Sequence, residues 1–470
     1  MSIVSIQFNE EKQPKYLQLF EHIKHLITAG ELEAGEKLPT VRNLSKILNI
    51  NSITVVNAYR QLENHKYITA KKGSGYFISN IKIQKEETPT SSDLGMSTEP
   101  DAINFASATP HPSIFPIESF KECINDVLQR DKGFAFGYQE SNGFKPLRNS
   151  ILHYLKRRYN IWAKDEENLL IVSGAQQGID LIGKALLNPG DYVITENPTY
   201  DGAVAVFKSR GARVVGVNME DDGMDLVDLE KKIRICKPKL IYLMTCYQNP
   251  TTICYSNAKM RRILELAIKY NLYIVEDDTM SELNYDNREQ APLKALDNEN
   301  KFVIYLKSFS KILMPGLRTG CMIIPDLLIK DFTKIKHTSD ISSSGLVQRS
   351  LDQYFRTGKW EDHLNYMKEI YMGKYEYMLG QLERLEKYGV KFQKPNGGLY
   401  FWINLPKNIS ARTIYNFCRN SGLVVIPSGV FYEHDNKNKD RSLRLSFASS
   451  NIEQIRNGMS ILEACVEKLL

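Results

Sequence analysis

From residue 169 onward the chain alternates short apolar stretches with longer segments of helical periodicity, and this alternation strongly constrains the fold. Neighbouring parallel strands need a crossover connection, usually a helix, so strands separated in this way predict an α/β unit with a mainly parallel sheet. Ligands of such sheets bind beyond the carboxyl ends of the strands. The apolar stretches cover residues 169–172, 192–195, 213–217, 240–245, 272–276 and 303–307.

Polar residues collect directly after four of these stretches, at positions 173–176, 247–250, 277–278 and 308–311. One pocket at the sheet edge would gather them. A glycine turn that opens a helix can hold an anion together with an arginine, a carboxylate can face a protonated ring nitrogen, and a lysine can capture an aldehyde. Pyridoxal 5′-phosphate (PLP) carries all three groups, so these residues predict a PLP site.

Each of these signals is weak when it stands alone. A lysine after Ser-x-Ser is more often a solvated surface residue, and Asp277 with Asp278 could cap a helix. The segment 178–184 is close to a phosphate-binding loop, but Ala185 stands where Ser or Thr would bind magnesium, so we interpret it as a buried helix. The histidines show no metal-binding spacing, and no metal site is predicted.

The first eighty residues carry a different pattern. Residues 14–29 have the spacing of an amphipathic helix, and Thr40 and then Asn51 or Ser52 can cap two further short helices. Residues 67–78 are typical of two strands joined by a basic, glycine-rich hairpin. Three helices and a basic hairpin predict a winged helix-turn-helix, although the pattern alone also fits a small helical packing domain with a charged turn.

Residues 30–79 carry the motifs G-x-L-x-x-G-x-x-L-P-[ST]-x-R-x-L and T-V-x-x-A-Y-x-x-L-E, and this segment resembles the DNA-binding domain of GntR-type bacterial regulators. The resemblance implies that the helix from Ser52 lies in the major groove and that the hairpin tip approaches the minor groove. A base-reading arginine common near the start of this helix is replaced by Asn51, Ser52 and Ile53, so the operator sequence does not follow. The positions implied to bind DNA are Arg42, Ser52, Thr54, Tyr59, Lys71, Lys72, Gly73 and Gly75.

Residues 82–101 separate the two regions and are rich in Glu, Ser, Thr and Pro, which is typical of a linker. A flexible coil of this length averages about 25 Å between its ends, enough for the N-terminal unit to reach another subunit. The predicted organisation is a winged helix-turn-helix over 1–80, a flexible linker over 81–102 and an effector domain over 103–470.

The motifs SGAQQGID, ENPTY, CYQNPT, IVEDD, SFSKILMPGLRTG, PNGGLYFW and SLRLSFA stand in the order seen in fold type I aminotransferases, which the chain resembles over about 103–470. The resemblance implies a PLP-dependent transferase fold, with a mainly parallel large domain and a smaller C-terminal α+β subdomain. Lys311 would form the Schiff base, Asp277 would keep the pyridine nitrogen protonated, and Arg444 would bind a substrate or effector carboxylate. The other implied positions are Gly174, Ala175, Gln176, Ser308, Ser310 and Arg318 at the phosphate, Tyr200 on the ring, Asn249 and Thr279 near the phenolic oxygen, and Tyr138 reaching across a dimer interface.

The segment after the acidic pair departs from this family. A tyrosine that donates to the phenolic oxygen usually follows within two positions, and Thr279 and Met280 stand here instead. Loss of that donor should alter the cofactor's proton chemistry and slow catalysis. Transaminase activity is therefore expected to be weak or absent.

A GntR-like winged helix joined by a linker to an aminotransferase-like domain is the architecture of the MocR/GabR group of bacterial transcription regulators, which the chain resembles from end to end. The resemblance implies a regulator that binds double-stranded operator DNA and senses an amine, an amino acid or PLP itself through an aldimine at Lys311. It also implies a homodimer with a head-to-tail, domain-swapped arrangement. A catalytically active aminotransferase with an appended winged helix stays open as the alternative.

Composition adds limits to these predictions. No apolar run approaches the roughly 18 residues that a membrane span needs, and the first residues lack an export signal, so we expect a cytoplasmic protein with no membrane partner. The seven cysteines are scattered without a C-x-x-C pair, which argues against a disulfide framework. The net charge of +6 is too mild to indicate nucleic-acid binding by itself, so the DNA argument is local.

Overall fold

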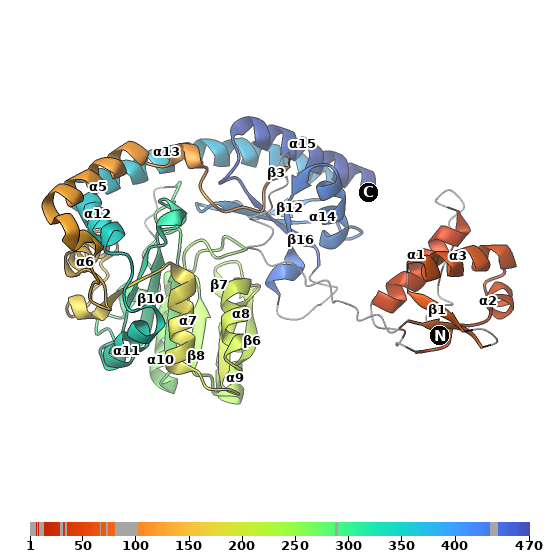
Figure 1. Ribbon diagram of the computed structural model, residues 1–470, viewed down its shortest axis with the longest axis horizontal. Coiled ribbons are helices and arrows are strands. Elements are labelled where there is room, and N and C mark those ends of the chain that lie inside the picture. The colour runs from red at the N-terminus through yellow and green to blue at the C-terminus, as the bar shows by residue number, and fades with distance from the viewer. Residues whose placement is uncertain are drawn as a thin grey trace. The chain divides into compact units, whose positions relative to one another are not determined.

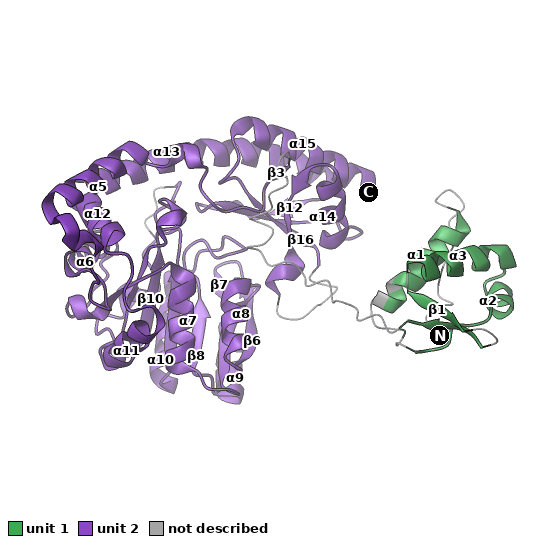
Figure 2. Cartoon of the chain, in the orientation of Figure 1, with its two compact units in different colours: residues 1–88 green, residues 89–470 purple. Residues whose placement is uncertain are grey.

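The computed structural model contains two compact units, one over residues 1–88 and one over residues 89–470 (Figures 1 and 2). Each is described by itself. The predicted linker lies outside the described residues except for Ala102. The described residues are 6, 8, 14–28, 32, 35–65, 67–71, 74–79, 102–286, 290–432 and 440–470.

The N-terminal unit has three helices followed by a two-stranded hairpin. Thr40 begins the second helix by accepting a hydrogen bond from the Asn43 N–H at 3.2 Å, and Asn51 begins the third by accepting one from the Ile53 N–H at 2.9 Å. Apolar residues of all three helices form one core. The elements are α1 (Lys15–Thr28), α2 (Val41–Ile47), α3 (Ser52–Asn64), β1 (Ile68–Lys71) and β2 (Gly75–Ile78).

Tyr59 corrects one of the predicted DNA contacts. Its side chain is fully buried, and its hydroxyl donates to the Pro39 carbonyl at 2.8 Å. Its ring also meets the ring of Tyr76 edge-on, which ties α3 to the hairpin. The spacing of Tyr59 along α3 places it on the same face as Val55 and Leu62, so it packs in the core rather than against DNA.

The C-terminal unit is built on an eight-stranded sheet in the order β4-β11-β10-β9-β8-β5-β6-β7 (Figure 1). Pairing is parallel from β10 through β6, which confirms the predicted mainly parallel sheet, while β11 runs antiparallel between β4 and β10. The strands are β4 (Leu169–Val172), β5 (Tyr192–Asn197), β6 (Arg213–Glu220), β7 (Gly223–Met224), β8 (Leu240–Leu243), β9 (Tyr273–Asp278), β10 (Val303–Ser308) and β11 (Gly320–Ile323).

Helices cover both faces of this sheet. Alternate residues of β5 point to opposite faces, so Val193 joins the core beneath α7, α8 and α11, while Ile194 joins the core beneath α9 and α10. Burial on both faces explains why the strands are apolar without alternation. The helices are α7 (Ala175–Leu186), α8 (Asp201–Ser209), α9 (Leu226–Cys236), α10 (Asn257–Tyr270) and α11 (Ile329–Asp340).

A smaller α+β part is formed mainly by the C-terminal segment, with an antiparallel sheet in the order β12-β13-β16-β15. Strand β3, near the start of the unit, pairs with β14 of this part, and the long helix α13 extends along it (Figure 1). The remaining elements are β3 (Ile103–Asn104), α5 (Ile117–Asp131), α6 (Lys145–Tyr159), α12 (Gly345–Arg356), α13 (Lys359–Glu383), β12 (Lys391–Phe392), β13 (Tyr400–Asn404), α14 (Ala411–Asn420), β14 (Leu423–Val424), β15 (Ile426–Pro427), β16 (Ser442–Ser446) and α15 (Ile452–Leu469), with 3-10 turns at Pro112–Ile114, Lys132–Phe136, Glu166–Asn168, Leu293–Leu296, Pro315–Leu317, Asp326–Leu328, Arg384–Tyr388 and Ser428–Phe431.

Within the described part of the chain, no helix combines the length and the apolar character needed to cross a bilayer.

Candidate functional site

A glycine turn and an arginine meet where β4 passes into α7. Gly174 has φ +83°, and an added Cβ would lie 2.9 Å from Nη2 of Arg318. The same nitrogen donates to the Ser173 carbonyl at 2.8 Å. Strand β11 causes this approach, because its antiparallel pairing returns Arg318 to the end of β4. The N-terminal amides of a helix and a guanidinium form an anion site.

Lys311 lies in the loop after β10, and its side chain is partly buried. Its pKa is lowered to about 8, first by burial and then by the positive charges of Arg444 and Arg318. Three cationic side chains therefore act on one another at the sheet edge. Such an arrangement favours a neutral lysine amine and a bound anion.

Asp277 is the penultimate residue of β9 and is buried. Its Oδ2 accepts a hydrogen bond from the Tyr242 hydroxyl at 2.6 Å, while its buried Oδ1 has no hydrogen-bond partner among the described residues. Burial raises its pKa to about 6, with Asp278 adding to the rise and Tyr242 and Lys307 opposing it. The carboxylate thus has one oxygen held by the protein and one suited to a cationic N–H donor.

Arg444 in β16 meets Asn249, which follows β8. Its Nη1 donates to Asn249 Oδ1 and its Nη2 to the Ala106 carbonyl, both at 2.8 Å. Its guanidinium carbon lies 4.5 Å from the ring centre of Tyr400 and 5.2 Å from that of Phe431. Its Nε is buried and has no partner in the described part of the chain, and burial lowers the pKa of the guanidinium. This geometry suits a carboxylate ligand.

The smaller predicted positions lie around these groups. The Tyr200 hydroxyl donates to Gln176 Oε1 at 3.2 Å, joining the start of α8 to the start of α7, where Ala175 is the first residue. Ser308 ends β10, and its Oγ accepts from the Ser310 N–H at 3.3 Å.

Two predicted positions need separate comment. Thr279 is half-buried directly after β9, whereas the side chain of Met280 is fully buried in the core. Tyr138 is 85% exposed. Its predicted reach across a dimer interface stays a prediction.

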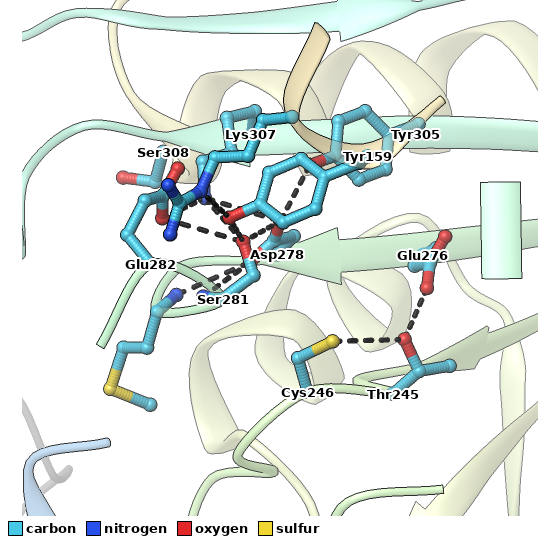
Figure 3. Close-up of polar contacts among 12 residues, drawn as sticks. Tyr159, Thr245, Cys246, Glu276, Asp278, Ser281, Glu282, Tyr305, Lys307 and Ser308 are labelled. Carbon is cyan, nitrogen blue, oxygen red and sulfur yellow. Dashed lines mark hydrogen bonds and ion pairs between the residues drawn. The ribbon is translucent and has the colours of Figure 1, made fainter. Parts of the chain in front are cut away.

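Figure 3 shows a charged network around Lys307 and Asp278, the residues next in sequence to Ser308 and Asp277. The Lys307 ammonium donates to Glu282 Oε2 at 2.6 Å and pairs with Asp278 Oδ2 at 3.1 Å. Tyr305 and Ser281 donate to the same Asp278 oxygen. Burial acts to raise the pKa of Asp278, but the Lys307 charge and these hydrogen bonds outweigh it and lower the pKa. The two neighbouring aspartates therefore differ: Asp278 is a buried ion-pair partner, and Asp277 faces the site.

Sequence reasoning missed Tyr242 and Lys307. Both lie in buried strands, and both appeared only as members of apolar stretches. A buried lysine and a buried tyrosine hydroxyl need polar partners, so their presence in such strands was the available signal. This signal could not identify the hydrogen-bond and ion-pair partners of Tyr242 and Lys307, because those partners lie on neighbouring strands and loops.

The predicted DNA-binding residues lie in the N-terminal unit. Arg42 and Ser52 are exposed, Thr54 is half-buried, and Lys71 is exposed with its Nζ 4.8 Å from the ring centre of Phe77. Gly75 has φ +105°, a conformation that favours glycine in a hairpin. Lys72 and Gly73 lie outside the described residues. Their predicted contacts, like those of the exposed residues, stay predictions.

The residues of the C-terminal unit fit PLP on three independent grounds. Gly174 and Arg318 suit its phosphate, and Lys311 suits its aldehyde. The buried Oδ1 of Asp277, which has no partner in the part of the chain that the structure describes, suits its protonated ring nitrogen. When bound, PLP supplies an electron sink conjugated to the nitrogen of an attached amine.

Comparisons with known proteins match each of the two units to a family. Residues 100–462 match the family "Aminotransferase class I and II", and residues 15–78 match "Bacterial regulatory proteins, gntR family". Aromatic-amino-acid aminotransferase 1 of Thermococcus litoralis is 33% identical and covers 87% of this chain and 95% of its own. The uncharacterized HTH-type transcriptional regulator YdfD of Bacillus subtilis is 29% identical and covers 99% of both chains.

The crystal structure of Pyrococcus horikoshii kynurenine aminotransferase, in complex with PMP, shares the fold. It has a TM-score of 0.74 and 32% identity, covering 80% of this chain and 93% of that one. The cofactor of the present site is accordingly pyridoxal 5′-phosphate. The chain belongs to the aminotransferase class I and II family and carries a GntR-type helix-turn-helix domain ahead of its aminotransferase domain.

Proposed function

We propose that the protein is a PLP-dependent transcription regulator whose C-terminal unit senses an amine or amino acid and alters the DNA affinity of its N-terminal unit. Relatives named as HTH-type transcriptional regulators support the proposal, because they match this chain almost from end to end. A GntR-type domain supplies the DNA-binding element. The aminotransferase site supplies the chemistry that recognises an amine.

One contact carries the proposal. Arg444, the residue suited to the effector carboxylate, holds the carbonyl of Ala106 at 2.8 Å. Ala106 follows β3, the first strand after the predicted linker, and β3 pairs with β14. An effector carboxylate that engages Arg444 therefore competes with a contact to the segment nearest the linker.

The chain's own residues define the sensing step. Lys311, with a pKa lowered to about 8, holds a reactive amine for the cofactor aldehyde. Asp277 Oδ1 holds the proton on the ring nitrogen, and Arg444 with Asn249 orients the carboxylate of an incoming amino acid. The effector must bind one arrangement of the two units better than the other, and a coupling of about 1–3 kcal/mol changes DNA affinity roughly 5- to 150-fold.

Titration of the PLP-loaded protein with a panel of amines and amino acids tests this function. Visible absorption reports capture at the cofactor, and fluorescence anisotropy reports affinity for DNA from the regulator's own upstream region. We expect at least one compound to change both. Lys311→Ala should abolish both the visible absorption and the effector response, while DNA binding persists. The control variant Lys330→Ala, at an exposed lysine, should leave the absorption and the effector response unchanged. An unchanged effector response in Lys311→Ala would contradict the proposal.

A working aminotransferase is the second candidate, favoured by the complete set of Lys311, Asp277 and Arg444 and by the 33% identity to an aminotransferase. Thr279 and the buried Met280 argue against fast turnover, because they stand where the family usually has a tyrosine whose hydroxyl donates to the phenolic oxygen of the cofactor. Steady keto acid formation with DNA affinity unchanged would favour this candidate. A change in DNA affinity without keto acid product supports the regulator.

We also propose that the protein acts as a homodimer in which Tyr138 reaches the partner's cofactor site, with the N-terminal units exchanged head to tail. The 85% exposure of Tyr138 and the neighbouring exposed aromatic residues Phe134 and Phe136 support an interface at this segment. Two paired N-terminal units would bind two operator half-sites.

A further inference from the structure

The outward face of α3 lies opposite the side of the helix that packs in the core of the N-terminal unit. Asn51 fixes the start of the helix, and Ser52 Oγ donates to Ser45 Oγ of α2 at 3.3 Å, which holds the first turn against its neighbour. The buried face consists of Val55, Ala58, Tyr59 and Leu62, all 0% exposed. The opposite face exposes Ser52, Ile53, Val56, Asn57 and Arg60.

Two apolar side chains stand out on this polar face. Ile53 is 66% exposed and Val56 is 44% exposed, and a spacing of three residues makes them neighbours on one helical turn. Neither belongs to the core of the unit. Isolated exposed apolar residues are ordinary, but an adjacent pair in the first turns of a helix-turn-helix recognition helix faces the ligand surface of that fold.

The exposed charged side chains of α2 and α3 are positive, and the one acidic residue of these helices, Glu63, is half-buried. Arg42 and Lys46 are exposed on α2, and Arg60 is exposed on α3. Neither α2 nor α3 has an acidic residue in its first turn. Positive side chains flanking an apolar pair suit a ligand with anionic edges and an apolar centre. The DNA major groove has this character where thymine methyl groups lie between the phosphate backbones.

We propose that Ile53 and Val56 read the C5-methyl groups of thymines in the major groove, with Asn57 reading an adjacent adenine, so that the operator carries A·T pairs at these positions. The inference rests on the proposed DNA-binding function and specifies its ligand. Asparagine can bond both N6 and N7 of adenine, and apolar side chains contact the thymine methyl. The four residue-to-residue steps from Ile53 to Asn57 rise about 6 Å, which is on the order of two base-pair steps.

The test uses the full-length, PLP-loaded protein. Binding sites are first selected from a library of randomised duplexes, and each thymine of the selected site is then replaced by deoxyuridine, which removes only the methyl group. We expect A·T pairs at fixed positions and an affinity loss of about fourfold for each contacted methyl, as for the exposure of one methyl to water. Anisotropy at one fixed salt concentration measures the affinity.

Variants identify the side chains. In Ile53→Ala with Val56→Ala, deoxyuridine should no longer lower affinity, whereas Ile47→Ala, at a 45% exposed isoleucine of α2, should keep the full methyl effect. A selected site that binds equally well with deoxyuridine overturns the inference and leaves the proposed DNA-binding function intact. Failure to select any site at low salt overturns both the inference and the proposed function. The deoxyuridine measurement on the unaltered protein needs no variant, so a folding defect cannot obscure it.

Discussion

The charge state of a single amine decides how Lys311 behaves. Its pKa falls from 10.5 to about 8 through burial and then through the charges of Arg444 and Arg318. Only the neutral amine attacks an aldehyde, so lowering the pKa raises the reactive fraction at neutral pH by more than about 100-fold. The neighbouring carboxylates act in the opposite sense on Lys307, whose ammonium stays charged between Asp278 and Glu282.

The pH dependence of PLP capture follows from this pKa. The neutral fraction of Lys311 grows as pH rises, so capture by the cofactor-free protein should accelerate about fivefold between pH 7 and 8 and level off above about pH 9. Stopped-flow absorbance between pH 7 and 10 measures the rate. Arg444→Gln removes one cation and should move the plateau to higher pH. A plateau near pH 10 in the unaltered protein would contradict the interaction among the three cations.

At this scale the sequence predicted side chains that the structure brings to the sheet edge and missed the side chains that support them. Lys311, Asp277 and Arg318 stand in motifs at strand ends, where order along the chain carries information. Tyr242 contacts Asp277 from the neighbouring strand β8, and such a pairing depends on strand order. Tyr59 was mispredicted for a related reason, since only its position on the buried face of α3 shows that it belongs to the core.

At the scale of elements, the close packing of α7 against β10 fixes the position of the glycine turn at Gly174, which precedes α7. An added Cβ at Gly178 would lie 2.4 Å from Leu306 Cδ1. Gly178→Ala should therefore force the helix away from the sheet and destabilise the C-terminal unit by about 1–3 kcal/mol, less the gain of up to about 1 kcal/mol in helix propensity. Gly380→Ala, in the exposed part of α13, should stabilise the protein, because an added Cβ there would meet no described atom within 4 Å beyond its chain neighbours and the adjacent helix backbone.

Urea unfolding followed by tryptophan fluorescence measures both glycine variants. PLP affinity gives a second readout, because displacement of α7 shifts Gly174 relative to Arg318, whereas Gly380 lies far along the sequence from either residue. Equal stabilisation by both substitutions would mean that α7 can move without strain.

Strand prediction succeeded where an apolar stretch stood apart from the motifs and failed where a strand continued directly from a motif. The six parallel or edge strands β4, β5, β6, β8, β9 and β10 coincide with the predicted apolar stretches. Strand β11 was not predicted, because its four residues follow the motif of Lys311 without a separate signal. Its antiparallel insertion between β4 and β10 comes from tertiary pairing, and yet it is the element that returns Arg318 to the glycine turn.

At the scale of the whole molecule, two units of different chemistry share one chain, and neither alone accounts for the sequence. The GntR-type domain and the aminotransferase domain were both predicted from their motifs and both are confirmed. The predicted dimer stays a proposal. Its physical basis is the segment that holds Phe134, Phe136 and Tyr138, whose three aromatic side chains are all exposed. A cluster of exposed apolar side chains of this kind is typical of a protein–protein interface.

Loss of this aromatic surface should separate the subunits. Phe134 and Phe136 are 81% and 69% exposed, and each ring buried in an interface contributes about 2 kcal/mol. A two-fold interface repeats every contact, so Phe134→Ser with Phe136→Ser should weaken dimerisation at least about 100-fold. Sedimentation velocity should show monomers at micromolar concentration, while Leu327→Ser, at an 87% exposed leucine, should leave the dimer intact. If Tyr138 completes the partner's cofactor site, the monomer should also bind PLP more weakly than the dimer does. A monomer that keeps full PLP affinity would disprove that role of Tyr138, because its cofactor site would then be complete within one chain.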